Sequence, residues 1–256
     1  MAKIFCVANQ KGGVGKTTTS VNLAAGLAKL NQRVLLVDLD PQGNATMGAG
    51  INKAGLASSI YPVLLGEAEV ADSRMRSESG RFDVLPANRE LAGAEVEMVE
   101  LDNRERRLKE ALAKVDADYD FILIDCPPAL SMLTLNGLVS AHGVIIPMQC
   151  EYYALEGLSD LVNTIKKVHA NLNQDLKIIG LLRVMFDPRM TLSQQVSAQL
   201  EQHFGDKVFK TIIPRNVRLA EAPSYGIPGV VFDPSAKGAQ AYIAFGAEMI
   251  ERIKTM

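Results

Sequence analysis

One stretch decides the fold expected of this 256-residue chain: Gln10-Lys11-Gly12-Gly13-Val14-Gly15-Lys16-Thr17-Thr18. An apolar run at residues 4–8 precedes it and is typical of a short buried strand, and apolar side chains at helical spacing follow it over residues 20–30. A strand, a glycine-rich loop and a helix in this order form a phosphate-binding loop. The glycines allow a tight turn that points backbone N–H groups at a phosphate, and the helix N-terminus adds partial positive charge. We therefore predict that this loop binds a nucleotide.

The side chains around the glycines refine this prediction. Lys16 can reach the β- and γ-phosphates of a nucleotide, and the Thr17 hydroxyl can complete the coordination shell of Mg²⁺. The common pattern G-x-x-x-x-G-K-[ST] requires a glycine at position 10, where this chain has Gln10. A second lysine, Lys11, stands at the start of the loop. The loop therefore departs from the common pattern at its first position and carries an additional cation.

A second predicted strand, at residues 33–38, ends in acidic residues. The sequence from its end reads Asp38-Leu39-Asp40-Pro41-Gln42-Gly43-Asn44. Carboxylates at the carboxyl end of a parallel strand, beside a phosphate loop, can hold Mg²⁺ or orient the attacking water. The alternative is that Asp38 and Asp40 only cap the turn that Pro41 and Gly43 enforce. The upstream loop favours the first interpretation.

A third strong strand is predicted at residues 119–125 and also ends in an aspartate, Asp125, before Cys126 and two prolines. An apolar strand that ends in aspartate is the Walker B arrangement, in which the carboxylate holds Mg²⁺ directly or through water. Cys126 lies close to this position, and we interpret it as a small packing residue.

Strand-like and helical segments alternate along the remaining chain. Apolar runs predict strands at residues 82–85, 143–149, 176–184 and 210–214, and periodic patterns predict helices at 60–65, 155–172, 192–204 and 237–253, with one or two more within 90–115. Strands separated by helices form βαβ units, so we predict an α/β fold with a mainly parallel twisted sheet and helices on both faces.

The loop resembles the deviant Walker A motif, K-G-G-x-G-K-[ST]. This motif marks a family that contains the partition ATPases (ParA/Soj), the septum-placement ATPase MinD, the nitrogenase iron protein and the arsenite-pump ATPase. Four strings occur in the order typical of the partition ATPases: KGGVGKTT, DLDPQGN, ILIDCPP and IPRNVRLAEAPS. The resemblance runs from Lys3 to about residue 250. It implies a P-loop NTPase, a single ATPase domain over residues 1–256, and no N-terminal helix-turn-helix domain.

The resemblance also implies slow hydrolysis of ATP with Mg²⁺ and assigns roles to residues. Lys16 is expected to neutralise phosphates, Thr17 and Asp125 to place Mg²⁺, and Asp40 to orient the water and support the metal. Lys11 is expected to reach across an ATP-bound homodimer to the partner's nucleotide. The residues expected to contact the nucleotide are Lys11, Gly12, Gly13, Val14, Gly15, Lys16, Thr17, Thr18, and at the adenine ring Pro214 and Asn216.

For partners, the resemblance implies that the dimer binds double-stranded DNA without sequence preference, through Arg189 and Arg218. A ParB-type centromere-binding protein would stimulate hydrolysis and release the dimer. The protein is then expected in the cytoplasm, on the nucleoid and not on a membrane. The formal net charge of −2 gives no support for nucleic-acid binding by the whole chain, so such a surface would be local or created by assembly.

Two other classes are less well supported by the sequence. A MinD-like membrane switch would end in a basic amphipathic helix, but acidic residues are interleaved over residues 248–256. An iron–sulfur reductase needs exposed cysteines, whereas Cys6 and Cys150 lie in strand-like apolar runs. All three cysteines, including Cys126, are expected to be buried thiols. A synthetase that shares the loop would need a substrate site, which the sequence does not reveal.

Overall fold

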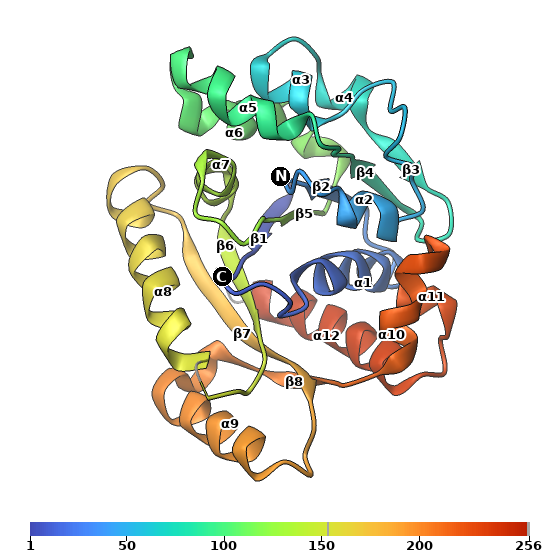
Figure 1. Ribbon diagram of the computed structural model, residues 1–256, viewed down its shortest axis with the longest axis vertical. Helices are drawn as coiled ribbons and strands as arrows, with labels where there is room; N and C mark the ends of the chain where they lie inside the picture. Colours follow the sequence, from blue (N-terminus) through green and yellow to red (C-terminus); the bar gives the residue numbers. More distant parts are fainter. Residues whose placement is uncertain (153, 255–256) are drawn as a thin grey trace.

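A computed structural model describes residues 1–152 and 154–254. Within these residues the strands form one sheet in the order β3-β4-β2-β5-β1-β6-β7-β8 (Figure 1). Neighbouring strands are parallel except for the antiparallel pair β3 and β4. The strands are β1 (Lys3–Val7), β2 (Val34–Asp38), β3 (Met75–Ser77), β4 (Phe82–Leu85), β5 (Phe121–Asp125), β6 (Gly143–Met148), β7 (Lys177–Phe186) and β8 (Val208–Pro214).

Helices and short 3₁₀ turns connect the strands. They are α1 (Lys16–Lys29), α2 (Asn44–Gly48), α3 (Ile60–Leu65), α4 (Val70–Ser73), α5 (Leu91–Glu97), η1 (Met98–Glu100), η2 (Arg104–Arg106), α6 (Arg107–Ala113), η3 (Asp116–Asp118), α7 (Met132–Ser140), α8 (Ala154–Asn171), α9 (Thr191–Phe204), η4 (Gly205–Lys207), α10 (Val217–Glu221), η5 (Ala222–Tyr225), α11 (Gly229–Phe232) and α12 (Lys237–Ile253). None of the described helices is both long enough and apolar enough to cross a membrane.

Helices cover both faces of the sheet, which explains why the strands are apolar on both sides. Every residue of β2 and β5 is buried. One core packs α1 and α12 against the sheet and contains Phe5 and Val7, whereas the other packs α3, α5, α6, α7 and α8 and contains Cys6 (Figure 1). The alternation of β1 side chains between the two cores follows from the period of two in a strand.

The helices α1 and α12 lie very close together. A Cβ atom at Gly26 would lie 3.2 Å from the carbonyl oxygen of Tyr242, so only glycine permits this approach without a shift of the backbone. The Tyr242 hydroxyl lies 3.0 Å from Thr19 Oγ1 within this contact. The predicted apolar stripe of α12 is therefore part of the core, where Tyr242, Phe245 and Met249 are buried.

The predicted α/β fold is confirmed, and the long predicted elements are present with small boundary changes. The helix after the loop begins at Lys16 instead of residue 20, because residues 16–19 are polar and carry no apolar period. Short elements were missed. The edge strand β3 exposes Met75 and Arg76, so it shows no alternation, and α7 is buried on almost all sides, so it shows no amphipathic period.

The sheet topology determines where the site lies. β1 has β5 on one side and β6 on the other, so the strand order reverses there. Ligands of open parallel sheets bind outside the carboxyl ends of the strands at such a point. The segments that follow β1, β2 and β5 meet at this edge, and these are the segments with the predicted glycine loop and the predicted aspartates.

Candidate nucleotide-binding site

The loop between β1 and α1 adopts the tight turn that its glycines predict. Gly13 and Gly15 have φ angles of 73° and 77°, in the left-handed region that favours glycine. The first helical bond runs from Thr19 N to Gly15 O at 2.9 Å. The end of β6 and the residue after it hold the loop, since Gln149 Nε2 donates to Gly13 O at 3.1 Å and Asn9 Nδ2 donates to Pro147 O at 2.8 Å. The backbone N–H groups at the start of α1 are thus set for an anion.

Lys16 lies inside the site. Its residue surface is only 8% exposed, and Nζ donates to the carbonyl oxygen of Lys11 at 3.0 Å. Burial lowers the pKa of Lys16, and the charge of Asp125 opposes this effect. The ammonium group therefore folds back over its own loop, beside the place where phosphates would bind.

Asp125 lies at the end of β5 and is 1% exposed. Its two carboxylate oxygens accept hydrogen bonds from Thr17 Oγ1 at 2.8 Å and from Ser20 Oγ at 2.7 Å. Burial raises the pKa of Asp125 to about 6, and the two hydroxyl bonds oppose the rise. A carboxylate next to a threonine hydroxyl at a phosphate loop fits Mg²⁺, which prefers few protein oxygens together with phosphates and water. The sequence analysis missed Ser20, which lies one helical turn after Lys16.

Asp38 and Asp40 lie in different surroundings. Asp38 is fully buried, and Oδ2 accepts bonds of 2.7 Å from both the backbone N and the Oγ1 of Thr46. Burial, followed by the charge of Asp125, raises the pKa of Asp38 to about 7. For Asp38 the capping interpretation therefore agrees with the geometry. Asp40 is partly exposed, and its negative charge acts on the pKa values of both Lys16 and Asp125, so it lies at the site.

A cavity beside the loop contains the two residues expected at the adenine ring. It has a volume of about 90 Å³ and is lined by Gly15, Thr18, Met185, Pro214 and Asn216, among others. Asn216 caps the N-terminus of α10, and its amide oxygen accepts from Leu219 N at 3.3 Å. Met185 has a φ angle of 50°, which is rare for a residue other than glycine and is found at functional sites more often than elsewhere. The structure thus brings Pro214 and Asn216 to the glycine loop.

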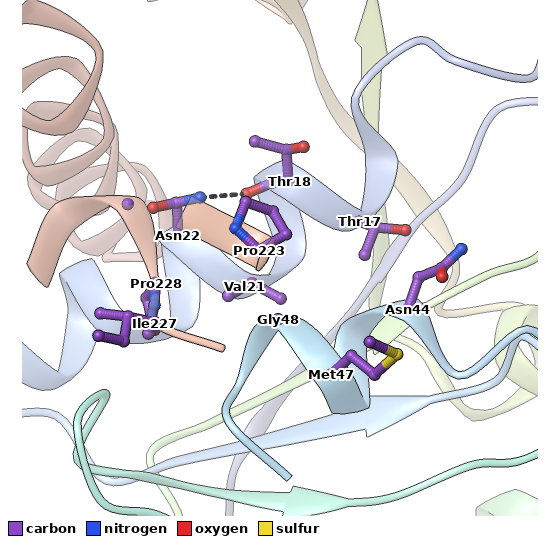
Figure 2. Close-up of a pocket in the computed structure, with 11 residues that line it drawn as sticks. Thr17, Thr18, Val21, Asn22, Asn44, Met47, Gly48, Pro223, Ile227 and Pro228 are labelled. Carbon is purple, nitrogen blue, oxygen red and sulfur yellow. Dashed lines mark hydrogen bonds between the residues drawn. The ribbon is translucent and has the colours of Figure 1, made fainter. Parts of the chain in front are cut away.

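A larger cavity of about 260 Å³ lies between α1, α2 and the segment after η5 (Figure 2). Thr17 and Thr18 line it together with Asn44 and Met47 of α2. Asn22 stabilises its wall, because Nδ2 donates to Thr18 O at 2.9 Å and Oδ1 accepts from Val230 N at 2.9 Å. No sequence pattern predicts this cavity, because its walls come from three distant segments. It connects the start of α1 with the segment that follows Asp40.

Lys11 differs from Lys16 in its exposure and in its hydrogen-bond partner. Its side chain is 46% exposed, and Nζ donates to Glu151 Oε2 at 2.7 Å. The Glu151 side chain is 49% exposed, so solvent screens this ion pair strongly. The sequence analysis did not identify Glu151, which is 140 residues away from Lys11 along the chain.

The two arginines expected to bind DNA lie in separate segments. Arg189 follows β7 and donates two hydrogen bonds to the carboxylate of Asp187, at 2.9 and 2.7 Å. These bonds lower the pKa of Asp187 to about 2. Arg218 of α10 contacts Glu221 at 2.9 Å and Asp233 at 3.5 Å. Each arginine is exposed but is already paired with a carboxylate of the same chain.

Comparisons with known proteins identify the family. A family model described as an AAA domain matches residues 2–178. The chain is 53% identical over 249 residues to the sporulation initiation inhibitor protein Soj of Bacillus subtilis, covering 97% of this chain and 98% of the relative. It is 48% identical to the chromosome-partitioning ATPase Soj of Treponema pallidum, covering 98% of both. The chain belongs to the ParA/Soj family of P-loop partition ATPases.

Solved structures agree with this fold. A Mycobacterium smegmatis protein named cobyrinic acid a,c-diamide synthase, with bound ADP and magnesium, has a TM-score of 0.87 and 40% identity, covering 99% of this chain and 96% of that one. The cell division ATPase MinD of Pyrococcus furiosus has a TM-score of 0.81 and 26% identity, covering 98% and 99%.

Proposed function

We propose that this protein is a DNA-segregation ATPase that hydrolyses ATP with Mg²⁺ and acts in chromosome or plasmid partition. The observation that carries the proposal is the glycine loop with two lysines in different surroundings, one buried and one exposed. The family membership and the names of the relatives at 48–53% identity support partition over the synthase name, which belongs to a protein at 40% identity.

The buried half of the site would bind the nucleotide within one chain. The loop amides and Lys16 would hold the phosphates, and Thr17 with Asp125 would hold Mg²⁺, which neutralises charge on the phosphate oxygens. Asp40, at the edge of this group, would orient the attacking water. Pro214 and Asn216 would contact the adenine ring in the cavity beside Gly15.

The exposed half would act between two chains. Lys11 lies at the rim of the loop, so its side chain can turn outward once it leaves Glu151. In an ATP-bound homodimer it would reach the partner's nucleotide and stabilise the charge that develops on the transferring oxygens, as an arginine finger does. Hydrolysis would remove that interaction and release the dimer.

DNA binding would use Arg189 and Arg218, which dimerisation would duplicate on one surface. Phosphate groups would have to replace Asp187, Glu221 and Asp233 as partners of these arginines. Contacts with phosphates alone give binding that depends strongly on salt and little on sequence. A ParB-type partner would stimulate hydrolysis, and the ATP-bound form would reside on the nucleoid in the cytoplasm.

A MinD-like membrane switch is the alternative within the same fold. That function uses a basic amphipathic helix that lies on lipid. Here the apolar side of α12 is occupied, because Tyr242, Phe245 and Met249 are buried in the core. This packing favours the partition proposal over the membrane alternative.

The proposal is tested by binding to a labelled DNA duplex of arbitrary sequence, with ATP, with ADP and without nucleotide, across a salt series. We expect binding with ATP that falls steeply with salt, and at least about tenfold weaker binding with ADP. Arg189→Ala and Arg218→Ala should each weaken binding and reduce the salt slope. DNA binding that is equally strong with ATP, with ADP and without nucleotide would contradict the proposed nucleotide switch. A parallel liposome sedimentation assay tests the membrane alternative.

A further inference from the structure

An apolar groove with an acidic rim lies outside the nucleotide site. It has a volume of about 470 Å³ and lies between the end of α3 and the segment formed by α5 and η1. We call it the acidic groove, and its lining residues are Leu65, Glu67, Val96, Glu97, Glu100 and Leu101. Leu65 and Leu101 contact the core and form the floor of the groove.

Two valines of this segment face solvent. Val96 is 74% exposed and Val99 is 55% exposed. Single exposed apolar residues are common, but here Val96 lines a groove together with two leucines, and Val99 lies three residues further along the same segment. Val96 and the two leucines therefore offer an apolar contact at this surface.

Carboxylates of the groove lie near the Tyr61 phenol. Tyr61 donates to Glu97 Oε1 at 2.7 Å. The pKa of Tyr61 is raised mainly by this bond, and the charges of Glu97, Glu67 and Glu90 add to the effect. Glu67 and Glu97 of the groove lining, together with Glu90 outside it, thus lie near one phenol, so carboxylates gather at this end of the groove.

Two arginines lie beside the groove, but neither is paired with a carboxylate of its rim. Arg107 donates to the backbone carbonyl oxygens of Leu64 and Leu65, and Arg104 donates to the carbonyl oxygen of Val99. Lys114 pairs with Glu69, which does not line the groove. Across residues 1–152 and 154–254, no Lys or Arg nitrogen lies within 4.0 Å of the carboxylates of Glu67, Glu97 or Glu100.

We propose that the acidic groove docks a basic peptide segment of a partner protein, with one apolar side chain of that segment anchored against Val96 and the leucines. Charge complementarity selects this occupant, since lysines or arginines on both sides of the anchor would pair with Glu67, Glu97 and Glu100. Nucleic acid is excluded from this surface by the same charges.

The position of the groove suits simultaneous binding of two partners. In Figure 1, α3 and α5 lie at the top of the molecule, whereas the β7–α9 connection with Arg189 lies at the bottom and α10 with Arg218 at the right. A basic segment in the acidic groove therefore leaves the proposed DNA arginines accessible. The docking proposal does not depend on ATP hydrolysis and can be tested without nucleotide.

The test uses two fluorescein-labelled peptides, one with a leucine flanked by lysines on both sides and one with serine in place of the leucine. We expect the leucine peptide to bind the wild-type chain about five- to tenfold more tightly, because the anchor is buried on binding. Val96→Ser should remove this preference. The matched control is Val217→Ser, because Val217 is 70% exposed on α10 and lies outside the groove.

A second pair of variants tests the charges. Glu67→Lys combined with Glu100→Lys should weaken binding of the leucine peptide more than tenfold at low salt, whereas Glu78→Lys, an exposed acid in the β3–β4 turn, should change it less than about twofold. Equal binding of both peptides, or a leucine preference that survives Val96→Ser, would overturn the proposal. Loss of peptide binding because the chain self-associates through the groove, detected by sedimentation velocity, would also overturn the proposal.

Discussion

Lys16 and Lys11 belong to one loop, yet their surroundings differ. Lys16 is 8% exposed and is hydrogen-bonded to the loop itself, whereas the Lys11 side chain is 46% exposed and pairs with a carboxylate of a distant segment. The buried lysine and its neighbours Thr17 and Asp125 form a site that one chain completes. The exposed lysine is held only by a screened ion pair, which another negative group can replace. In the proposed function, this difference separates nucleotide binding within one chain from the step that would require a second chain.

The largest expected effect comes from the buried lysine. Lys16→Ala should lower nucleotide affinity and ATP hydrolysis by at least about 100-fold, because it removes the buried cation of the loop that would hold the phosphates. Titration with a fluorescent ADP and an assay of phosphate release measure the two effects. Lys29→Ala, an exposed lysine at the end of the same helix, is the control and should change both by less than about twofold. Retained affinity in Lys16→Ala would contradict the proposed site.

Mixing two inactive variants tests whether Lys11 of one chain acts on the nucleotide of the other chain. Lys11→Ala keeps the buried half of the site, and Lys16→Ala keeps the exposed lysine. In a mixed dimer the nucleotide on the Lys11→Ala chain would receive the intact Lys11 of the other chain. An equal mixture should then hydrolyse ATP faster than the sum of the separate variants, because only a mixed dimer combines an intact Lys16 and an intact Lys11 at one site. Hydrolysis no higher than the sum of the separate variants would argue against action between chains.

The buried carboxyl group of Asp38 should make the free energy of unfolding depend on pH. Burial raises the pKa of Asp38 in the folded chain to about 7, above the ordinary value of 3.8, so the folded chain binds this proton more tightly than the unfolded chain. The free energy of unfolding should therefore fall as pH rises from about 4 to about 7 and then level off, by about 1 kcal/mol or more from this group. Asp38→Asn should flatten this dependence in urea unfolding without nucleotide. An unchanged slope would show that another group causes it.

The smallest expected effect comes from the exposed ion pair. Glu151→Gln removes the carboxylate that holds Lys11, and exposed pairs contribute less than about 1 kcal/mol. Dimer formation with ATP should therefore strengthen by about two- to fivefold, as measured by sedimentation across protein concentrations. Glu69→Gln breaks the exposed pair with Lys114 and should leave dimerisation unchanged. A Glu151→Gln variant that fails to dimerise would show that Glu151 has a different role.

The sequence predicted the part of the site that is formed by residues close to one another along the chain. Apolar runs and glycine spacing predict the loop with Lys16 and Thr17 and the strand that ends at Asp125. The structure brings Thr17 Oγ1 within 2.8 Å of Asp125 Oδ2. The α/β fold followed for the same reason, since buried parallel strands are continuous apolar runs.

The remaining features depend on contacts between distant segments. The bond from Ser20 to Asp125 joins residues 105 positions apart, and the Lys11–Glu151 pair joins residues 140 positions apart. Neither contact leaves a periodic trace in the sequence. Asp38 illustrates the same limit, because its partner Thr46 lies in α2, a helix too short to show a period.

The most direct test of the account is sedimentation velocity of the wild type and of Lys11→Ala, each with ADP and with ATP, together with the ADP affinity of both. The wild type should be monomeric with ADP and dimeric with ATP. Lys11→Ala should bind ADP within about twofold of the wild type and stay monomeric with both nucleotides. A Lys11→Ala variant that forms the ATP-dependent dimer, or one that loses ADP binding, would contradict the proposal that Lys16 binds the nucleotide within one chain and Lys11 acts between chains.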